Sequence, residues 1–231
     1  MTAATALSYS AHHDAVAGGR FIRVVNYHNT PHASRDALCQ ELRTFGTRFD
    51  SIGLDELDRF FETGSWGTDR PGFLPVFYEG YRNSAEVAGP VCDELGITGW
   101  FPVCTGFVDS PVPEQEAYAR SHHIGLVAED LANRGQRLAM TWEEITDLSR
   151  RHVVTPHTAS HYGINDVATD EELEREIVEP KRLMDAVTGQ SAPAFVWLHG
   201  TPWGMSARHD DAVRAAGYRY LISNTMIHRI G

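Results

Sequence analysis

The sequence is poor in cysteine and contains no long apolar run. Three cysteines occur in its 231 residues (Cys39, Cys92 and Cys104), and no two of them form a CxxC pair. A disulfide framework is therefore excluded, and the odd number suits a reducing compartment. No stretch approaches about 18 consecutive apolar residues, so the sequence predicts no transmembrane helix.

Basic side chains are also scarce relative to acidic ones. Lys and Arg number 20 against 31 Asp and Glu, which gives a formal net charge of −11. Because nucleic acids and anionic membranes bind basic patches, neither is expected as a partner. The first 20 residues lack the basic segment and the apolar core of a signal peptide. We therefore expect a cytoplasmic protein with a small-molecule or carbohydrate substrate, and nothing in the sequence indicates an oligomeric state.

Apolar runs and amphipathic segments alternate along most of the chain. Residues 1–19 are small and polar and end in two glycines, which predicts a flexible N-terminal leader. The remainder, residues 20–231, is expected to form one domain. Its predicted strands are residues 21–27, 49–52, 73–78, 99–104, 152–155, 194–198 and 218–223. Strands that alternate with helices predict a parallel α/β fold, here one barrel-like domain of about seven strands.

Helices are predicted between these strands. The expected segments are residues 34–45, 54–63, 85–95, 141–151, 169–187 and 206–216. Thr141 and Glu144 have the spacing of a capping box. Pro180, inside the fifth helix, predicts a kink or a break. Residues 105–139 form the least regular stretch, which is expected to hold one or two short helices in a long insertion.

Histidine is abundant, at 12 residues, and several histidines follow predicted strands. In parallel α/β folds, reactive groups collect at the carboxyl ends of the strands. Because histidine is the commonest metal ligand and titrates near neutral pH, a cluster at this end indicates a functional site. The side chains that follow the predicted strands are His28, Glu79, His157, His161, His199 and, near the end of the chain, His228.

His157 and His161 provide the strongest local signal. Two imidazoles four residues apart can lie on one face of a helical turn and bind one ion, at about 2.0–2.1 Å for zinc. Glu79 is the candidate third ligand, which would complete a His₂-carboxylate site with open positions for water and substrate. A metal there would lower the pKa of a bound water and polarise a carbonyl oxygen. The alternatives are a surface or capping pair of histidines and a solvated loop carboxylate.

The segment PHTASH (156–161) resembles the His-Ser/Thr-x-x-His motif of the polysaccharide deacetylases, the NodB-homology or carbohydrate esterase family 4 enzymes. VVNYHNTP (24–31) resembles the family's opening strand, and MTWEEITDLSRRHVVT (140–155) the helix and strand before the histidine pair. The segments that begin at Pro75, Phe195 and Ala212 are similar to the family's first motif, its sixth strand and its penultimate helix and strand. The resemblance covers about residues 21–231. It implies a distorted seven-stranded (β/α) barrel, a divalent metal ion with zinc preferred, and hydrolysis of N- or O-acetyl groups of sugars through a metal-activated water.

The resemblance also implies roles for individual residues. The implied metal ligands are Glu79, His157 and His161. Tyr78 stands where the family has its general-base aspartate, so a group with a pKa of about 4 is replaced by one near 10. The base would then be a strongly perturbed Tyr78, or His28, His199 or Glu79 itself. His228 is the nearest match to the family's general-acid histidine, although its local pattern differs.

Aromatic side chains near the same strand end are candidates for contact with a substrate ring. Trp197 and Trp203 are the expected substrate-binding residues, with core packing as the alternative, at least for Trp197. The pairs His12-His13 and His122-His123 are expected at the surface.

These residues fit three functions. The first is a metal-dependent hydrolase of the deacetylase type, which cleaves non-peptide carbon–nitrogen bonds or O-acetyl groups of a sugar-like or small substrate in carbohydrate metabolism. The second is a catalytically inactive relative that binds a ligand or regulates a partner, because the usual Asp-Asp pair is replaced. The third is a metal-free amidohydrolase on the same scaffold, which would use histidines and Glu79 directly. The retained histidine pair favours the first.

Overall fold

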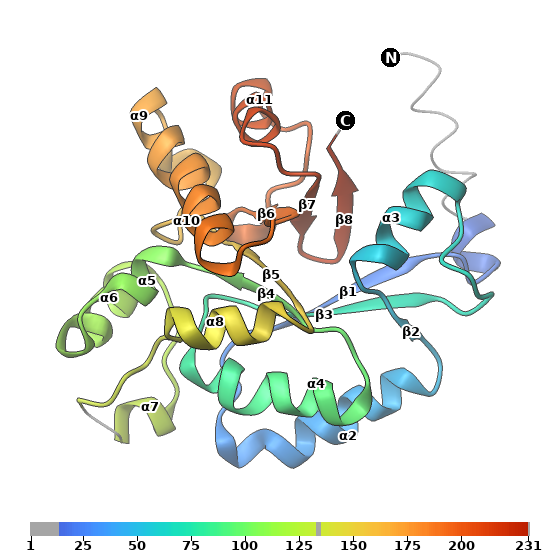
Figure 1. The fold of residues 1–231 in the computed structure, drawn as a ribbon, viewed down its shortest axis with the longest axis horizontal. Coiled ribbons are helices and arrows are strands. Elements are labelled where there is room, and N and C mark those ends of the chain that lie inside the picture. Colours follow the sequence, from blue (N-terminus) through green and yellow to red (C-terminus); the bar gives the residue numbers. More distant parts are fainter. Residues whose placement is uncertain (1–13, 133–134, 231) are drawn as a thin grey trace.

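The computed structural model describes residues 14–132 and 135–230, and its helices surround a central group of strands (Figure 1). The strands are β1 (Ile22–Tyr27), β2 (Asp50–Ser51), β3 (Gly72–Phe77), β4 (Trp100–Val103), β5 (Val153–Pro156), β6 (Ala194–Val196), β7 (Tyr220–Ser223) and β8 (Met226–Arg229). The α-helices are α2 (Arg35–Gly46), α3 (Leu54–Thr63), α4 (Gly89–Leu95), α5 (Thr105–Asp109), α6 (Gln115–Ser121), α7 (Ala128–Ala132), α8 (Trp142–Ser149), α9 (Asp170–Leu173), α10 (Glu179–Thr188) and α11 (Ala207–Ala215). Two π-helical turns, η2 (Ser84–Ala88) and η5 (Glu174–Val178), run directly into α4 and α10.

The strands form two sheets. In the first, β1, β3, β4 and β5 lie side by side in that order, β2 also pairs with β3, and all these pairings are parallel. In the second, β6 and β7 are parallel, and β8 returns antiparallel to β7. Parallel strands joined through helices place the carboxyl ends of the strands at one end of the fold.

The two sheets adjoin at both of their outer edges. Between β5 and β6, the Thr155 hydroxyl donates to the carbonyl of Ala194, and the Ala194 amide donates back to Thr155 Oγ1 at 3.2 Å. On the other side, β8 lies beside β1, and the Val24 amide donates to the carbonyl of Thr225 at 3.3 Å. Adjacent strands therefore follow the order β1-β3-β4-β5-β6-β7-β8, with side-chain and loop hydrogen bonds at the two seams.

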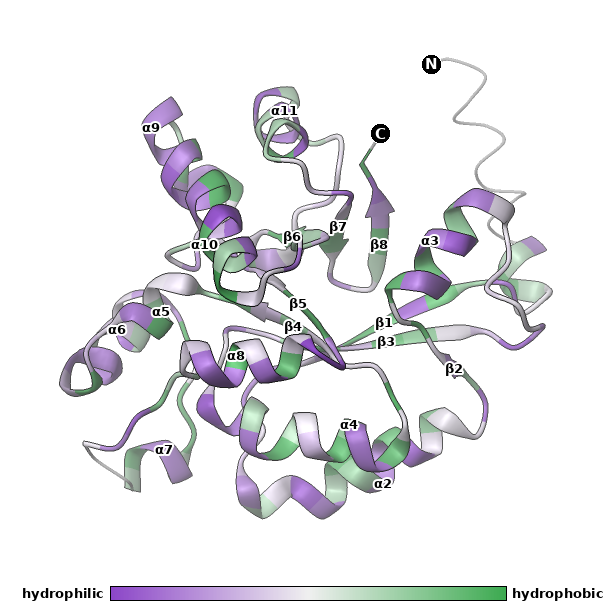
Figure 2. Ribbon diagram, viewed as in Figure 1, coloured by the Kyte–Doolittle hydropathy of each residue, from purple (hydrophilic) through white to green (hydrophobic). Residues whose placement is uncertain are grey.

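Apolar side chains fill the layer between the first sheet and its helices. Every residue of β3, β4 and β5 is buried, as expected for parallel strands that are covered on both faces. Phe77 on β3 and Phe101 on β4 stack with ring centroids 5.2 Å apart, in a core cluster that includes side chains of α2, α4, α8 and α10. Figure 2 shows the same division, with hydrophobic strands inside and helices whose outer faces are hydrophilic.

The structure confirms the seven predicted strands, each within two residues of its predicted ends. β8 was not predicted, because four residues after a short turn are too few to show a hydrophobic period. The predicted break at Pro180 is confirmed as the π-turn η5, which separates α9 from α10. The stretch 105–139 holds α5, α6 and α7, more than the one or two helices expected.

The predicted leader lies mostly outside the described residues. Residues 1–13 are not described, and residues 14–17 form a helical turn. Within the described ranges, no helix is both long enough and apolar enough to cross a membrane.

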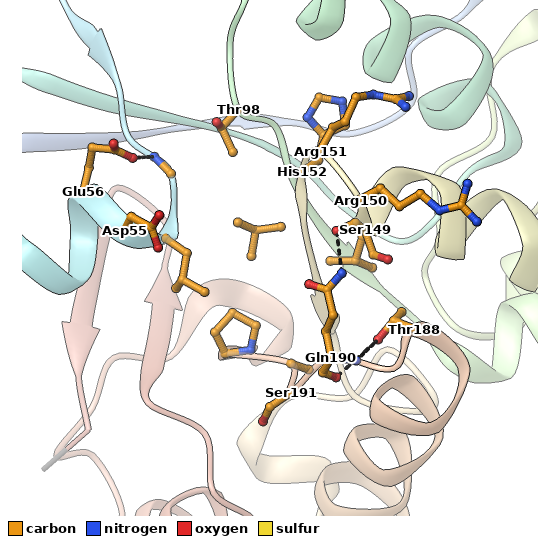
Figure 3. A pocket seen from close by; sticks show the side chains of 16 residues that line it. Asp55, Glu56, Thr98, Ser149, Arg150, Arg151, His152, Thr188, Gln190 and Ser191 are labelled. Carbon is orange, nitrogen blue, oxygen red and sulfur yellow. Dashed lines mark hydrogen bonds between the residues drawn. The ribbon is translucent and has the colours of Figure 1, made fainter.

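A cavity of about 360 Å³ opens at the amino ends of β4, β5 and β6 (Figure 3). Asp55 and Glu56 at the start of α3 lie on one side of it, and Arg150 lies on the other. This is the end of the fold opposite to the predicted site residues, which follow the carboxyl ends of the strands.

Candidate metal centre

A pocket of about 660 Å³ opens at the carboxyl ends of β1, β3, β5, β6 and β7. The loops after these strands line it, together with part of the 105–139 insertion. Among its described lining residues there is neither Lys nor Arg, so the pocket has no permanently cationic side chain. The predicted site residues that line it are His28, Tyr78, Glu79, His157, His161, Trp197 and His199.

Glu79 ends β3 in a sharp turn. Both Glu79 and Gly80 have left-handed backbone angles, with φ of 70° and 84°. A Cβ on residue 80 would lie 2.9 Å from Cγ1 of Val103, so only glycine fits there without a shift of its neighbour. The Glu79 side chain is buried, at 3% exposure. A left-handed glutamate costs conformational energy, and such strain concentrates at functional sites.

His157 and His161 both lie buried after β5, on an irregular turn. The turn is not helical, because Thr158 and His161 adopt left-handed φ values of 54° and 57°. The two imidazoles nevertheless come together, with ring centroids 4.9 Å apart and nearly perpendicular planes. One ligand-type atom from each of Glu79, His157 and His161 lies within 4.8 Å of the other two. The three residues that the sequence suggested as ligands therefore form one buried cluster.

Hydrogen bonds fix the orientation of both imidazoles. Nδ1 of His157 lies 3.1 Å from the carbonyl of Val196, and Nδ1 of His161 lies 2.7 Å from the carbonyl of His122. A carbonyl oxygen only accepts, so each Nδ1 carries a proton, and in the neutral imidazole each Nε2 keeps its lone pair. Metal-binding histidines are oriented in this way, by donating the second ring N–H to a carbonyl or carboxylate. The donor set of the cluster therefore fits a divalent cation.

The charge states of the cluster also fit the binding of a divalent cation. Burial alone would raise the pKa of Glu79, but the adjacent imidazoles of His161, whose Nε2 lies 3.5 Å from the carboxylate, and of His28 outweigh it and lower that pKa to about 2. Burial, assisted by the neighbouring His161, lowers the pKa of His157 to about 3. An ionised carboxylate and a neutral imidazole are the forms that bind a metal ion.

The imidazole of His28 lies against the carboxylate of Glu79. Its Nδ1 is 2.9 Å and 3.0 Å from the two carboxylate oxygens, and the hydrogen bond raises the pKa of the imidazole. Its side chain is 64% exposed, whereas Glu79 is buried. His28 therefore connects the buried carboxylate to the open part of the pocket.

Tyr78 packs between two imidazoles. Its ring stacks on His28 at 5.3 Å and lies 5.5 Å from His157, and its hydroxyl donates to Oδ1 of Asn26 at 3.1 Å. Burial, together with the negative charge of Glu79, raises the pKa of Tyr78 further above 10. This environment favours a neutral phenol, which opposes a role as general base.

The remaining predicted residues occupy different surroundings. His199 is exposed, lines the pocket and has a φ of 65°. Trp197 is 1% exposed and packs on Phe195, so its indole belongs to the core as well as to the pocket wall. Two other residues lie outside the pocket lining. Trp203 lies under the guanidinium of Arg214, and His228 on β8 is hydrogen-bonded through Nε2 to the Ser223 hydroxyl at 2.7 Å.

The insertion contributes residues that the sequence did not suggest. Residues 123–127 line the pocket apart from Ile124, and the Tyr81 hydroxyl holds this segment through the carbonyl of Gly125 at 2.7 Å. His123, expected at the surface, is exposed but also lines the pocket. Asn26, Asn29 and Asn224 also line it. Their positions at strand ends were the available signal for these asparagines, whereas nothing in the local sequence indicates that residues 123–127 line a pocket.

The fold and the cluster together define a parallel α/β protein with a buried His₂-carboxylate centre at its strand ends. No known family model matches the sequence, and no curated protein matches it. Solved structures of deacetylases share the fold, which confirms the fold that the resemblance implied.

Three of these structures show the extent of the likeness. The deacetylase PplD of Streptococcus pyogenes, solved with acetate, is 14% identical, with a TM-score of 0.63 over 85% of this chain and 80% of its own. IcaB from Ammonifex degensii is 16% identical, with a TM-score of 0.64 over 87% and 82%. A de-N-acetylase from Aggregatibacter actinomycetemcomitans is 14% identical, with a TM-score of 0.64 over 91% and 89%.

Proposed function

We propose that residues 20–231 form a single domain of the polysaccharide deacetylase type that acts as a metal-dependent hydrolase. The substrate would be an N-acyl or O-acetyl group of a sugar-like or small molecule, with attack by water. The observation that carries this proposal is the buried cluster of Glu79, His157 and His161, whose imidazoles both present Nε2. The shared fold of solved deacetylases supports it.

In this proposal the three clustered residues hold a divalent cation, with zinc as the first candidate because the ligand set is two histidines and a carboxylate. Such an ion supplies Lewis-acid polarisation and lowers the pKa of water. The pocket around it holds a neutral acyl group, since no described lining residue is Lys or Arg. Trp197, a buried residue of the pocket wall, offers an apolar edge to that group.

Proton transfer is assigned to imidazoles that line the pocket. His28 donates Nδ1–H to the carboxylate of Glu79, which leaves Nε2 as its free proton acceptor. A carboxylate that orients an imidazole in this manner is a recurring catalytic arrangement. His199 lines another side of the pocket and is the second candidate. Tyr78 is assigned a structural role, and His228 is given none, because it does not line the pocket.

An inactive, ligand-binding relative is the second candidate function. It is favoured by one observation: the residue beside Glu79 is a buried tyrosine whose environment raises its pKa, in place of a carboxylate. A metal-free amidohydrolase based on the His28–Glu79 contact is the third possibility to be tested.

Metal analysis of the purified protein, combined with an assay of amine release from N-acetylated sugars and small amides, separates these functions. We expect about one equivalent of metal in the wild type and in His209→Gln, a histidine control outside the pocket. We expect a trace in His157→Ala and His161→Ala, with loss of amine release. Metal without turnover would indicate the inactive relative, and turnover without metal would indicate metal-free chemistry.

A further inference from the structure

Glu176 is a fully buried carboxylate on the helix that packs behind the candidate metal centre. Its side chain is 0% exposed, and it lies on the π-turn η5. It accepts hydrogen bonds from the Ser160 amide at 2.8 Å and the Ser160 hydroxyl at 3.0 Å, and from Nε of Arg175 at 3.1 Å. Ser160 lies between the two clustered histidines, so this carboxylate is bound to their turn.

Pro180 explains why η5 is a π-turn. In a regular α-helix, Pro180 would lack the N–H that bonds to the carbonyl of Glu176, and its ring would clash with that carbonyl. The chain instead forms the wider turn Glu174–Val178, in which the Glu179 amide donates to the carbonyl of Glu174, five residues back. Such π-turns inside helices are frequent at functional sites. Here η5 carries the buried side chain of Glu176 toward the turn that bears the two clustered histidines, residues 157–161, which we call the histidine turn.

The histidine turn needs stabilising contacts with other segments of the chain. Thr158 and His161 have left-handed φ values, and each costs roughly 1–3 kcal/mol relative to ordinary backbone. The Ala159 carbonyl accepts from the Gly106 amide at 2.8 Å and from the Tyr118 hydroxyl at 3.3 Å. Among the described residues, Glu176 is the only charged hydrogen-bond partner of residues 158–160. Hydrogen bonds to an ionised acceptor are stronger than neutral ones, which suits a strained segment.

We infer that Glu176 is a positioning residue: through Ser160 it holds the turn that aims Nε2 of His157 and His161 at one point. Ionised carboxylates are costly to bury, and a hydrophobic residue would pack the same space at no such cost. This carboxylate accepts hydrogen bonds from the residue that lies between the two candidate ligands in the sequence. A residue that only filled space would not need such contacts. The inference rests on the proposed metal site for its consequence, but the orientation of the imidazoles can be measured without metal.

The first test is cobalt binding to the full chain, followed by the visible spectrum of bound Co²⁺. Glu176→Ala is expected to weaken Co²⁺ binding about 10- to 100-fold and to change the spectrum, as loss of outer-shell support does elsewhere. Glu176→Gln keeps the volume and one acceptor oxygen, and is expected to restore most of the affinity. Glu174→Ala is the matched control, since this acid lies on the same turn but pairs with Arg182 at the surface; its affinity and spectrum should equal those of the wild type.

The second test uses the metal-free protein labelled with ¹⁵N-histidine. In the wild type, His157 and His161 should be observed as Nδ1–H tautomers by long-range ¹H–¹⁵N correlation. Glu176→Ala should convert at least one of them to a mixture with the Nε2–H form, and Glu176→Gln should not. If Glu176→Ala does not fold, Glu176→Leu removes the acceptor while filling the space.

The outcomes are distinct. Wild-type tautomers and unchanged Co²⁺ binding in a folded Glu176→Ala or Glu176→Leu variant would overturn the inference. If the wild type bound no Co²⁺, the proposed function would fail, while altered tautomers in the variants would still support the positioning role of Glu176.

Discussion

The Nδ1–H of His161 donates to the backbone carbonyl of His122 at 2.7 Å, which links the candidate metal centre to the insertion after β4. The imidazole of His122 is itself stacked, 3.9 Å from the ring of Tyr118 and 6.0 Å from that of Tyr162. The stack fixes the backbone of His122 and hence the acceptor of His161. The segment that lines the pocket and the turn that bears the candidate ligands are therefore coupled.

Loss of this stack should weaken metal binding without removal of any ligand. Tyr118→Leu deletes both the ring beside His122 and the hydroxyl bound to Ala159, so we expect about 10-fold weaker zinc affinity in a competition titration. Tyr118→Phe keeps the ring and should lose less. Equal affinities for the wild type and Tyr118→Leu would show that the insertion does not support the centre.

Tyr78→Phe should retain most of the proposed hydrolytic activity. The hydroxyl of Tyr78 donates to Asn26, and burial keeps its proton bound, so its removal costs one hydrogen bond of about 1 kcal/mol. We expect a fall in kcat of no more than about 10-fold. A drop of about 100- to 10,000-fold, the range for loss of a general base, would instead make Tyr78 catalytic. His28→Gln, assayed in parallel, is expected to show the larger loss.

The sequence predicted the framework of this site well. The hydrophobic period and the turn residues located seven strands. The residues after β1, β3, β5 and β6 could then be placed at one site, because parallel strands end at one face of the fold. Glu79, His157 and His161 could be placed together on that basis. The backbone conformation around these histidines could not be predicted, because left-handed φ values at Thr158 and His161 come from tertiary hydrogen bonds rather than from local preference.

The parts that sequence reasoning missed depend on long-range contacts. Residues 123–127 reach the pocket because Tyr81 holds Gly125 and Asn29 holds Asp130, contacts between segments more than 40 residues apart. His228 follows β7 in sequence, as expected, but β8 turns back antiparallel and places it beside Ser223. A hairpin of this length has too little sequence pattern to reveal its direction.

Zinc should stabilise the wild-type protein and not its ligand variants. A ligand at 100 times its Kd contributes about 2.7 kcal/mol, which for a domain of this size raises Tm by about 5–10 °C. Chelation should reverse the rise. His157→Ala should show a Tm that neither zinc nor chelator changes, whereas His209→Gln should behave as the wild type. An equal zinc response in His157→Ala would place the bound metal elsewhere.

His152 should make the protein less stable at acid pH. Burial lowers the pKa of its imidazole, although Asp93 at 3.4 Å opposes the shift, while Arg151 adds to it. Its folded pKa therefore lies below the unfolded value of about 6.5. The unfolded chain binds the proton first as pH falls through 6.5, so stability is full above that pH and declines below it. Urea unfolding at pH 8 and pH 5.5 should show a smaller decline for His152→Asn than for the wild type; equal declines would exclude His152 as a source.

Asp130 should hold the pocket side of the insertion in place. Its carboxylate accepts from Nδ2 of Asn29 at 2.6 Å and from the Val127 amide at 2.9 Å, so it ties α7 to the loop after β1. In Asp130→Ala we expect faster hydrogen exchange in residues 125–132 and a KM raised several-fold, with kcat changed less, because the pocket wall loosens while the clustered Glu79 and histidines are untouched. Glu116→Ala, which removes an exposed pair with Arg120 on α6, is the matched control and should change neither quantity. Unchanged exchange in Asp130→Ala would mean that other contacts hold this wall.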